Sequence, residues 1–225
     1  MSLESNLTAD YFAQFWPASS RHNRRYQDDG PLTMLGGKIV WLLGVVCWCA
    51  IRYTPYRRAR RIRTAVERDR NRERMLLGLS FLGMFVLPLV FVATNEPLFA
   101  NYSAAPPQIV FGAVICAGAM WIFYKTHKDL GKNWSATLEV RDGHVLVTTG
   151  IYRTLRHPMY AGYWLWMISQ ALLLSNWIAG LAGIVAFGLH FFLRVGHEEQ
   201  MLREKFGEGY TDYEARTNRI IPRLY

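Results

Sequence analysis

Two short stretches in the C-terminal half combine side chains that could bind and orient a small molecule. The first is Arg156-His157-Pro158-Met159-Tyr160-Ala161-Gly162. Proline disfavours helical geometry in the residue before it and suits the first position of a helix, so we expect a helix to begin at Pro158. Its unpaired N–H groups could bind a carboxylate or a phosphate. The alternative is that Arg156 and Tyr160 only anchor the chain at a membrane surface.

The second stretch holds Arg194, His197, Glu198 and Glu199. Arg194 and Glu198 are four residues apart, so they share one face of a helix. Glu199 is turned by about 100° from Glu198 around the helix axis, so the two carboxylates cannot have the same role. A surface ion pair is the alternative, but Arg before Glu is the weaker order for such a pair, and the pattern therefore favours a site. His190, one turn earlier, is more typical of a packed histidine than of a ligand.

The distribution of charge shows what must position these stretches. The chain has 225 residues, a net charge of +9 and 51% apolar residues. None of its 26 Lys and Arg residues lies within 75–124 or 159–193, and Glu96 is the only formally charged side chain in those two segments. A soluble fold has no reason for such long cation-free segments, whereas a bilayer has. The sequence therefore predicts a polytopic membrane protein.

We expect an all-α fold with about five transmembrane helices. The predicted spans are residues 34–51, 75–93, 109–124, 160–174 and 177–193. Segments rich in Lys and Arg favour the cytoplasmic side of a membrane. Three such segments must therefore share that side, and they are 52–74, 125–158 and 194–225. The links 94–108 and 175–176 carry no cation and face the other side, so an odd number of spans places the N-terminus outside.

The chain divides into three regions on this basis. Residues 1–33 form a polar lead-in, residues 34–124 hold three helices, and residues 125–225 hold the candidate site with the helix pair 159–193. Loop 52–74 has ten Arg and is typical of a solvated loop beside anionic lipid headgroups rather than of a nucleic-acid site. Asp142-Gly143 between alternating apolar positions predicts a short hairpin.

The remaining small residues lie within the apolar spans. Cys47, Cys49 and Cys116 lack the spacing of metal ligands, so we expect buried packing and no metal site. Ala113/Ala117 and Ala182/Ala186 have the spacing that allows close contact between membrane helices.

The two stretches resemble the isoprenylcysteine carboxyl methyltransferase family and its bacterial relatives. The family signature is L-V-x-x-G-x-Y-x-x-x-R-H-P-x-Y-x-G, then a helix hairpin and R-x-x-x-E-E. It appears here as Leu146-Val147, Gly150, Tyr152, Arg156-His157-Pro158, Tyr160, Gly162, Arg194 and Glu198-Glu199. The resemblance covers roughly residues 125–222, while the first two spans match only as generic membrane helices.

The resemblance implies that the C-terminal half forms a cytoplasmic pocket for S-adenosylmethionine. The implied cofactor-binding residues are His144, Leu146, Val147, Gly150, Tyr152, Arg156, His157, Pro158, Tyr160, Gly162, Glu198 and Glu199. The backbone around Leu146-Val147 would edge the adenine, and Glu198 or Glu199 would pair with the ammonium. Arg194 and Glu198 are the implied catalytic residues, with Arg194 the partner of an acceptor carboxylate.

The expected function is therefore O-methylation of a carboxylate on a lipid-like or prenylated acceptor in the bilayer. Such a carboxylate is ionised at neutral pH and needs no general base. One alternative is N-methylation of a lipid amine, which needs a base such as His157 or His197. Two further alternatives are a sterol-type membrane reductase, for which no second phosphate-binding cluster is visible, and a non-enzymatic scaffold that uses loop 52–74. The sequence alone does not identify the acceptor.

Overall fold

The structure, a computed structural model, describes residues 19–59, 70–131 and 145–222. These residues are almost entirely helical and contain no strand, only isolated bridges. The α-helices are α2 (Ser19–Ala59), α3 (Arg70–Phe81), α4 (Leu87–Thr94), α5 (Pro106–Leu130), α6 (Pro158–Leu173), α7 (Trp177–Phe206) and α8 (Glu208–Arg216). A π-helical turn, η1 (Leu82–Val86), joins α3 to α4, and two short 3-10 turns are η2 (Leu98–Ala100) and η4 (Gly150–Arg153). The prediction of an all-α fold is confirmed.

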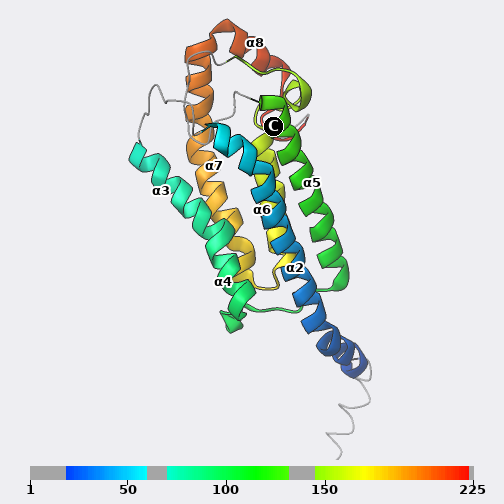
Figure 1. Ribbon diagram of the computed structural model, residues 1–225. Helices are drawn as coiled ribbons and strands as arrows, with labels where there is room; N and C mark the ends of the chain where they lie inside the picture. Colours follow the sequence, from blue (N-terminus) through cyan, green and yellow to red (C-terminus); the bar gives the residue numbers. More distant parts are fainter. Residues whose placement is uncertain (1–18, 60–69, 132–144, 223–225) are drawn as a thin grey trace, which may run out of the picture.

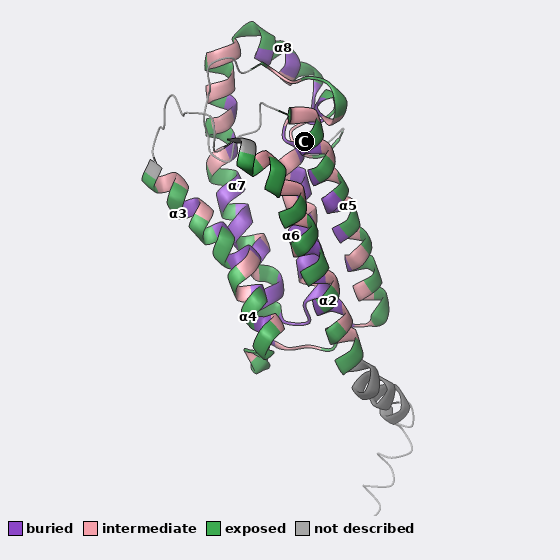
Figure 2. Cartoon of the chain, viewed as in Figure 1, coloured by how far each residue is buried: buried purple, intermediate pink, exposed green. Residues whose placement is uncertain are grey.

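The long helices run side by side as a bundle, with α8 across one end (Figure 1). Four segments are long and apolar enough to cross a membrane, and they are Pro31–Arg57, Asn71–Thr94, Pro106–Leu130 and Trp177–Phe206. The remaining predicted span, 160–174, is α6, whose 16 residues reach only about 24 Å at 1.5 Å per residue. It packs between α5 and α7. Large apolar side chains such as Val114, Val185 and Phe192 are exposed on the outside of the bundle (Figure 2), as in an integral membrane protein.

The cation-free links lie at one end of the bundle and the segments rich in Lys and Arg at the other, as the charge pattern predicts. At one end, the cation-free links meet: Tyr102 N donates to Ser175 O at 3.0 Å, and Asn176 Nδ2 donates to Asn101 Oδ1 at 2.7 Å. At the other end, Arg156 Nη1 donates to Glu214 O at 2.9 Å. The predicted cytoplasmic segments therefore share one end.

Three helix ends extend beyond the predicted boundaries of the spans. Helix α2 begins at Ser19, inside the predicted lead-in 1–33, and continues to Ala59, inside the predicted loop 52–74. Helix α3 begins at Arg70, so it also shortens that loop. Arg is a good helix former, and its long side chain lets a helix extend from hydrocarbon into the headgroup region. The predicted hairpin at 142–143 lies outside the described residues.

The predicted burial is found for one of the three cysteines. Cys116 is buried, but Cys47 and Cys49 are exposed on α2. An apolar thiol is as well accommodated by lipid as by a protein core, so its presence in an apolar span does not predict which of the two surrounds it.

Close packing between η1 and α7 holds the centre of the bundle together. A Cβ atom at Gly83 would lie 2.5 Å from Ala182 O and 2.6 Å from the Ala186 Cβ, so the predicted Ala182/Ala186 pair does form a helix contact. In the other predicted pair, Ala117 is exposed. The buried side chain of Gln170 donates from Nε2 to Gly83 O at 3.2 Å. Since a π-helical turn leaves carbonyls without regular partners, this bond stabilises η1.

We expect Gly83→Ala to destabilise the protein. The added methyl group meets backbone and a side chain of α7, so overpacking should lower the free energy of unfolding by about 1–3 kcal/mol. Thermal unfolding in detergent measures the loss. Gly118→Ala on α5 is the matched control, because nothing lies within 4 Å of its Cβ position; equal melting temperatures for the two variants would contradict the packing argument.

Candidate active site

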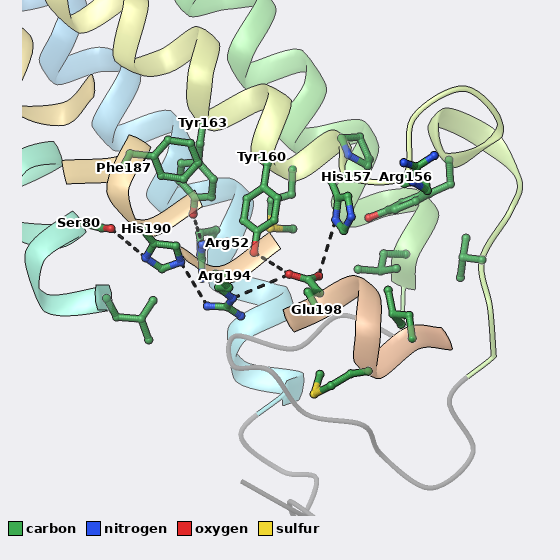
Figure 3. A pocket seen from close by; sticks show the side chains of 18 of the residues that line it. Arg52, Ser80, Arg156, His157, Tyr160, Tyr163, Phe187, His190, Arg194 and Glu198 are labelled. Atoms are coloured by element: carbon green, nitrogen blue, oxygen red, sulfur yellow. Dashed lines mark hydrogen bonds and ion pairs between the residues drawn. The ribbon is translucent and has the colours of Figure 1, made fainter. Parts of the chain in front are cut away.

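A cavity of about 630 Å³ opens at the bundle end that carries the cationic segments. Its size suits a small-molecule ligand. The walls come from α2, α3, η1, α6, α7 and the segment before η4, so they join residues far apart in the chain. One part of the wall is apolar and includes Trp48, Met84 and Phe85. The other part gathers the polar side chains drawn in Figure 3.

The start of α6 is built as the sequence predicts. Pro158 is its first residue, and His157 lies outside the helix with φ −124° and ψ 59°. The C-terminal segment holds this start in place, because Arg156 N donates to Asn218 O at 2.8 Å and His157 N donates to Arg219 O at 2.9 Å. The side chains of Arg156 and His157 both reach the cavity wall.

Glu199 is the centre of a buried ionic cluster behind that wall. Its side chain is 1% exposed, and it contacts four cationic or imidazole groups, of which Arg203 is the most distant at 3.9 Å. His157 Nε2 lies 3.2 Å from Oε1, Arg156 Nε lies 3.3 Å from the same oxygen, and Arg219 Nη2 lies 2.6 Å from Oε2. Glu199 is not among the residues that line the cavity, unlike the other predicted glutamate, Glu198. The turn of about 100° from Glu198 directs it to the C-terminal segment instead.

Glu198 faces the cavity and has different partners. Tyr160 OH donates to its Oε2 at 2.6 Å, and Arg194 Nε lies 3.9 Å from the same oxygen. His157 Nδ1 lies 3.9 Å from Oε1 (Figure 3). A carboxylate can accept about four hydrogen bonds, so one short bond leaves capacity for a ligand. The predicted difference between the two glutamates is thus seen in their surroundings.

Arg194 is nearly buried, with 12% of its side chain exposed. Its Nη1 lies 3.3 Å from Glu73 Oε1 and 3.4 Å from His190 Nε2. Its Nε atom is buried and has no hydrogen-bond partner in the described part of the chain. An unsatisfied buried donor is costly, and at a cavity wall a ligand atom can satisfy it.

His190 supports Arg194 from the membrane side. A guanidinium can only donate, so His190 Nε2 accepts and Nδ1 carries the proton. Nδ1 lies 2.9 Å from Ser80 Oγ and 3.3 Å from Leu76 O, which can only accept, so the same assignment follows from both sides of the ring. His190 lines the cavity, so interpreting it as a packed histidine missed its position.

Two further wall residues were missed because they lie in segments that look like membrane helix or loop. Arg52 donates to Tyr163 OH and lies with its guanidinium carbon 4.8 Å from the Trp48 ring centroid. Ser80 interrupts an otherwise apolar span, and a polar residue at membrane depth is a known sign of a functional position. That signal was available for Ser80, whereas Arg52 was one of ten similar residues in its loop.

The predicted site residues fall into two groups, those that line the cavity and those that do not. Those that line the cavity are Leu146, Val147, Tyr152, Arg156, His157, Pro158, Tyr160, Arg194 and Glu198. Gly150 and Gly162 do not, and His144 lies outside the described residues. Gly150 has φ +62° and a Cβ there would overlap Asp129, while a Cβ at Gly162 would lie 3.3 Å from Ile122 Cγ2 on α5. Both glycines therefore serve backbone packing, not contact with a ligand.

The C-terminal segment closes the site without adding a base. Tyr213 OH donates to Tyr152 O at 2.7 Å, and burial raises the pKa of Tyr213 to about 12. Burial also raises the pKa of Tyr152. Both phenols therefore stay protonated at neutral pH. Arg203 holds the pKa of Glu214 below its usual range through hydrogen bonds of 2.8 and 2.9 Å, which fasten α8 to α7.

Comparison with known proteins identifies a family. The family model described as "Isoprenylcysteine carboxyl methyltransferase (ICMT) family" matches residues 110–204. The protein-S-isoprenylcysteine O-methyltransferase of Dictyostelium discoideum is 35% identical over 157 residues, which cover 67% of this chain and 61% of that protein. A probable protein-S-isoprenylcysteine O-methyltransferase of Oryza sativa subsp. indica is 30% identical over 151 residues, 65% of this chain and 75% of that protein.

Two further matches cover less of the other protein. Protein-S-isoprenylcysteine O-methyltransferase B of Arabidopsis thaliana is 32% identical over 94 residues, 41% of this chain and 48% of that protein. A solved structure, described as the eukaryotic intramembrane Ras methyltransferase ICMT, has 25% identity and a TM-score of 0.47 over 71% of this chain and 55% of that chain. This chain thus spans about half to three quarters of the length of these four proteins. The matched residues 110–204 contain Arg194 and Glu198, whereas Arg52, Glu73 and Ser80 lie outside them.

We expect Glu199→Gln to destabilise the fold strongly. Arg156 and Arg219 would lose their buried anionic partner, a change that typically costs about 3–5 kcal/mol. The melting temperature in detergent should fall accordingly. Glu204→Gln, which changes an exposed carboxylate on the same helix, should leave it unchanged; a Glu199→Gln variant as stable as this control would show that the cluster contributes little.

Proposed function

The chain belongs to the isoprenylcysteine carboxyl methyltransferase family, and we propose that it transfers a methyl group from S-adenosylmethionine to a carboxylate on a lipid-like acceptor of the isoprenylcysteine type. The observation that carries this proposal is the Arg194 guanidinium at the cavity wall, with its buried Nε–H left without a hydrogen-bond partner among the described residues. In this proposal, the acceptor and the methyl donor bind to different parts of that wall.

Arg194 is the group that makes an acceptor carboxylate bindable at this depth. An unpaired carboxylate cannot leave water at acceptable cost, whereas one paired with a guanidinium through charge-assisted hydrogen bonds can. Glu73 and His190 both contact Nη1, and Arg194 lines the cavity, where an acceptor carboxylate can contact the guanidinium. The apolar wall formed by Trp48, Met84 and Phe85 supplies a place for the lipid part of the same molecule.

The other side of the cavity fits S-adenosylmethionine. When bound, this molecule supplies a sulfonium methyl group that is already activated for attack by a nucleophile. Glu198 presents a carboxylate with unused acceptor capacity toward its ammonium, and Leu146 and Val147 offer an apolar edge for its adenine. His157 and Tyr160 lie between these two places, next to the first turn of α6.

The residues of the chain then have a simple task. A carboxylate is ionised at neutral pH, so no side chain has to remove a proton. Arg194 orients the acceptor, Glu198 orients the donor, and the aromatic wall around Tyr160 and Phe187 excludes water from both. An amine acceptor would need a base; of the two candidate histidines, His197 does not line the cavity, so that alternative depends on His157.

We also propose that the cavity and the C-terminal segment face the cytoplasm. The cavity lies at the end of the bundle that carries most of the Lys and Arg residues, which favour the cytoplasmic side. Lys38, in the first half of α2, donates to Phe91 O at 3.2 Å near the opposite end of the bundle. Helix α2 therefore enters from the outside in this orientation.

Two measurements on the full chain in detergent test the function. Calorimetry with S-adenosylhomocysteine tests the donor site, and methyl transfer from labelled S-adenosylmethionine tests the acceptor. The acceptor panel contains a prenylcysteine with a free carboxylate, the same compound as its amide, a fatty acid and phosphatidylethanolamine. We expect label on the free prenylcysteine and none on its amide. Label on phosphatidylethanolamine alone would replace this function by N-methylation.

We expect Arg194→Ala to lose acceptor methylation and to keep donor binding. Removing one partner of a buried charge pair costs about 2–5 kcal/mol, so kcat/KM should fall by at least about 30-fold. Calorimetry should show S-adenosylhomocysteine binding within a few-fold of the unmodified chain. Equal loss of both activities would contradict separate donor and acceptor sides.

We expect Glu198→Gln to weaken donor binding. A hydrogen bond to a charged group contributes about 1.5–3 kcal/mol, so the dissociation constant of S-adenosylhomocysteine should rise by about 10- to 100-fold. Calorimetry measures this change directly, with Glu204→Gln as the control of equal charge change. An unchanged dissociation constant would remove Glu198 from the donor site.

A further inference from the structure

Glu73 contacts Arg194, the residue proposed to bind the acceptor carboxylate, and it lies in a part of the chain that the family model does not cover. It lies in the first turn of α3, and its Oε1 is 3.3 Å from Arg194 Nη1. Both side chains are nearly buried, with 13% of Glu73 and 12% of Arg194 exposed. The family match begins at residue 110, so this contact belongs to the N-terminal half of the chain.

Arg194 also has a carboxylate neighbour on its own helix. Glu198 follows it by four residues, a spacing at which Arg and Glu side chains can pair directly. In this structure they are 3.9 Å apart between Nε and Oε2, and Nε makes no hydrogen bond to any described residue. Glu198 Oε2 instead accepts from Tyr160 OH at 2.6 Å. Arg194 and Glu198 therefore form an ion pair at 3.9 Å but no direct hydrogen bond.

A direct hydrogen bond between Arg194 and Glu198 would remove the proposed contacts of both residues with their ligands. Nε would be taken from the acceptor carboxylate, and Glu198 would be taken from the ammonium of the donor. We propose that Glu73 is a positioning residue that keeps the Arg194 guanidinium from forming a hydrogen bond to Glu198, so that neither Nε nor the Glu198 carboxylate is occupied by the other. This inference rests on the proposed function.

The seam between α3 and α7 fixes Glu73 for this role. Arg72 Nη1 lies 3.0 Å from His197 Nε2, and Arg72 Nη2 donates to Leu193 O at 3.4 Å. Further into the membrane, Ser80 Oγ lies 2.9 Å from His190 Nδ1. Polar contacts on both sides of Glu73 thus hold α3 against α7, and the acid is presented to Nη1 from a fixed helix.

Charge explains why an acid is needed rather than a neutral side chain. His190 Nε2 also contacts Nη1, but at 3.4 Å and without charge. In a desolvated setting, the guanidinium turns toward the carboxylate that is nearest, because the Coulomb attraction is weakly screened there. If Glu73 is replaced by a neutral residue, Glu198 is the nearest remaining carboxylate to Arg194 among the described residues.

A double-mutant cycle tests this role with the full chain in detergent. The variants are Glu73→Gln, Glu198→Gln and both together, with Glu204→Gln as the matched control. The readouts are KM for the free prenylcysteine at saturating S-adenosylmethionine, the dissociation constant of S-adenosylhomocysteine and the melting temperature. Glu73→Ala is the second variant, in case the Gln variant does not fold.

We expect Glu73→Gln to raise the acceptor KM about tenfold and to weaken S-adenosylhomocysteine binding as well. In the Glu198→Gln background, the same change should alter the acceptor KM by less than about twofold, since no carboxylate remains on α7 to capture Arg194. A merely structural role would give the same factor in both backgrounds, and that result would overturn the inference. A lowered KM would also overturn it, because Glu73 would then compete with the acceptor.

The proposed function is tested separately, by methyl transfer with the unmodified chain. If the unmodified chain methylates no carboxylate in the panel, the proposed function fails. The dissociation constants of S-adenosylhomocysteine still decide the role of Glu73 in that case: its substitution must weaken binding when Glu198 is present and not when Glu198 is replaced. Unchanged binding in both backgrounds would then overturn the inference alone.

Discussion

A buried guanidinium at the mouth of the cavity is the constraint on which the rest of the site depends. Arg194 is nearly desolvated, so it must be compensated by anions, and the two that approach it come from different helices, Glu73 from α3 and Glu198 from α7. Neither contact satisfies its Nε–H. The site thus places two carboxylates beside one guanidinium, whose Nε–H still has no hydrogen-bond partner among the described residues.

The adjacent glutamates on α7 show how one helix can supply two separate functions. Glu198 faces the cavity and retains acceptor capacity, while Glu199 is buried among Arg156, His157 and Arg219. A rotation of about 100° between neighbours makes this division unavoidable. The cluster around Glu199 also fixes the start of α6, so the structural acid determines where the cavity-facing His157 can lie.

The sequence predicted the parts of this arrangement that depend on local geometry. Pro158 set the start of α6, and the spacing of Arg194 and Glu198 placed both on one face of α7. It did not predict contacts such as Glu73 with Arg194, because these depend on how two helices far apart in sequence pack. For Gly150 and Gly162, a glycine in a motif likewise gave no sign that Asp129 and Ile122 occupy the space beside it.

The two halves of the chain meet the cavity with different chemistry. The segment that matches the family model contributes the charged and hydrogen-bonding groups His157, Tyr160, Arg194 and Glu198. Helices α2 and α3 and the turn η1 add apolar side chains such as Trp48, Phe81 and Met84, and a wall of large side chains selects a lipid by its shape more than by its charge. Because η1 is held by Gln170 and packs at Gly83 against α7, that wall is stiff, and the size of acceptor it admits is set by packing inside the bundle.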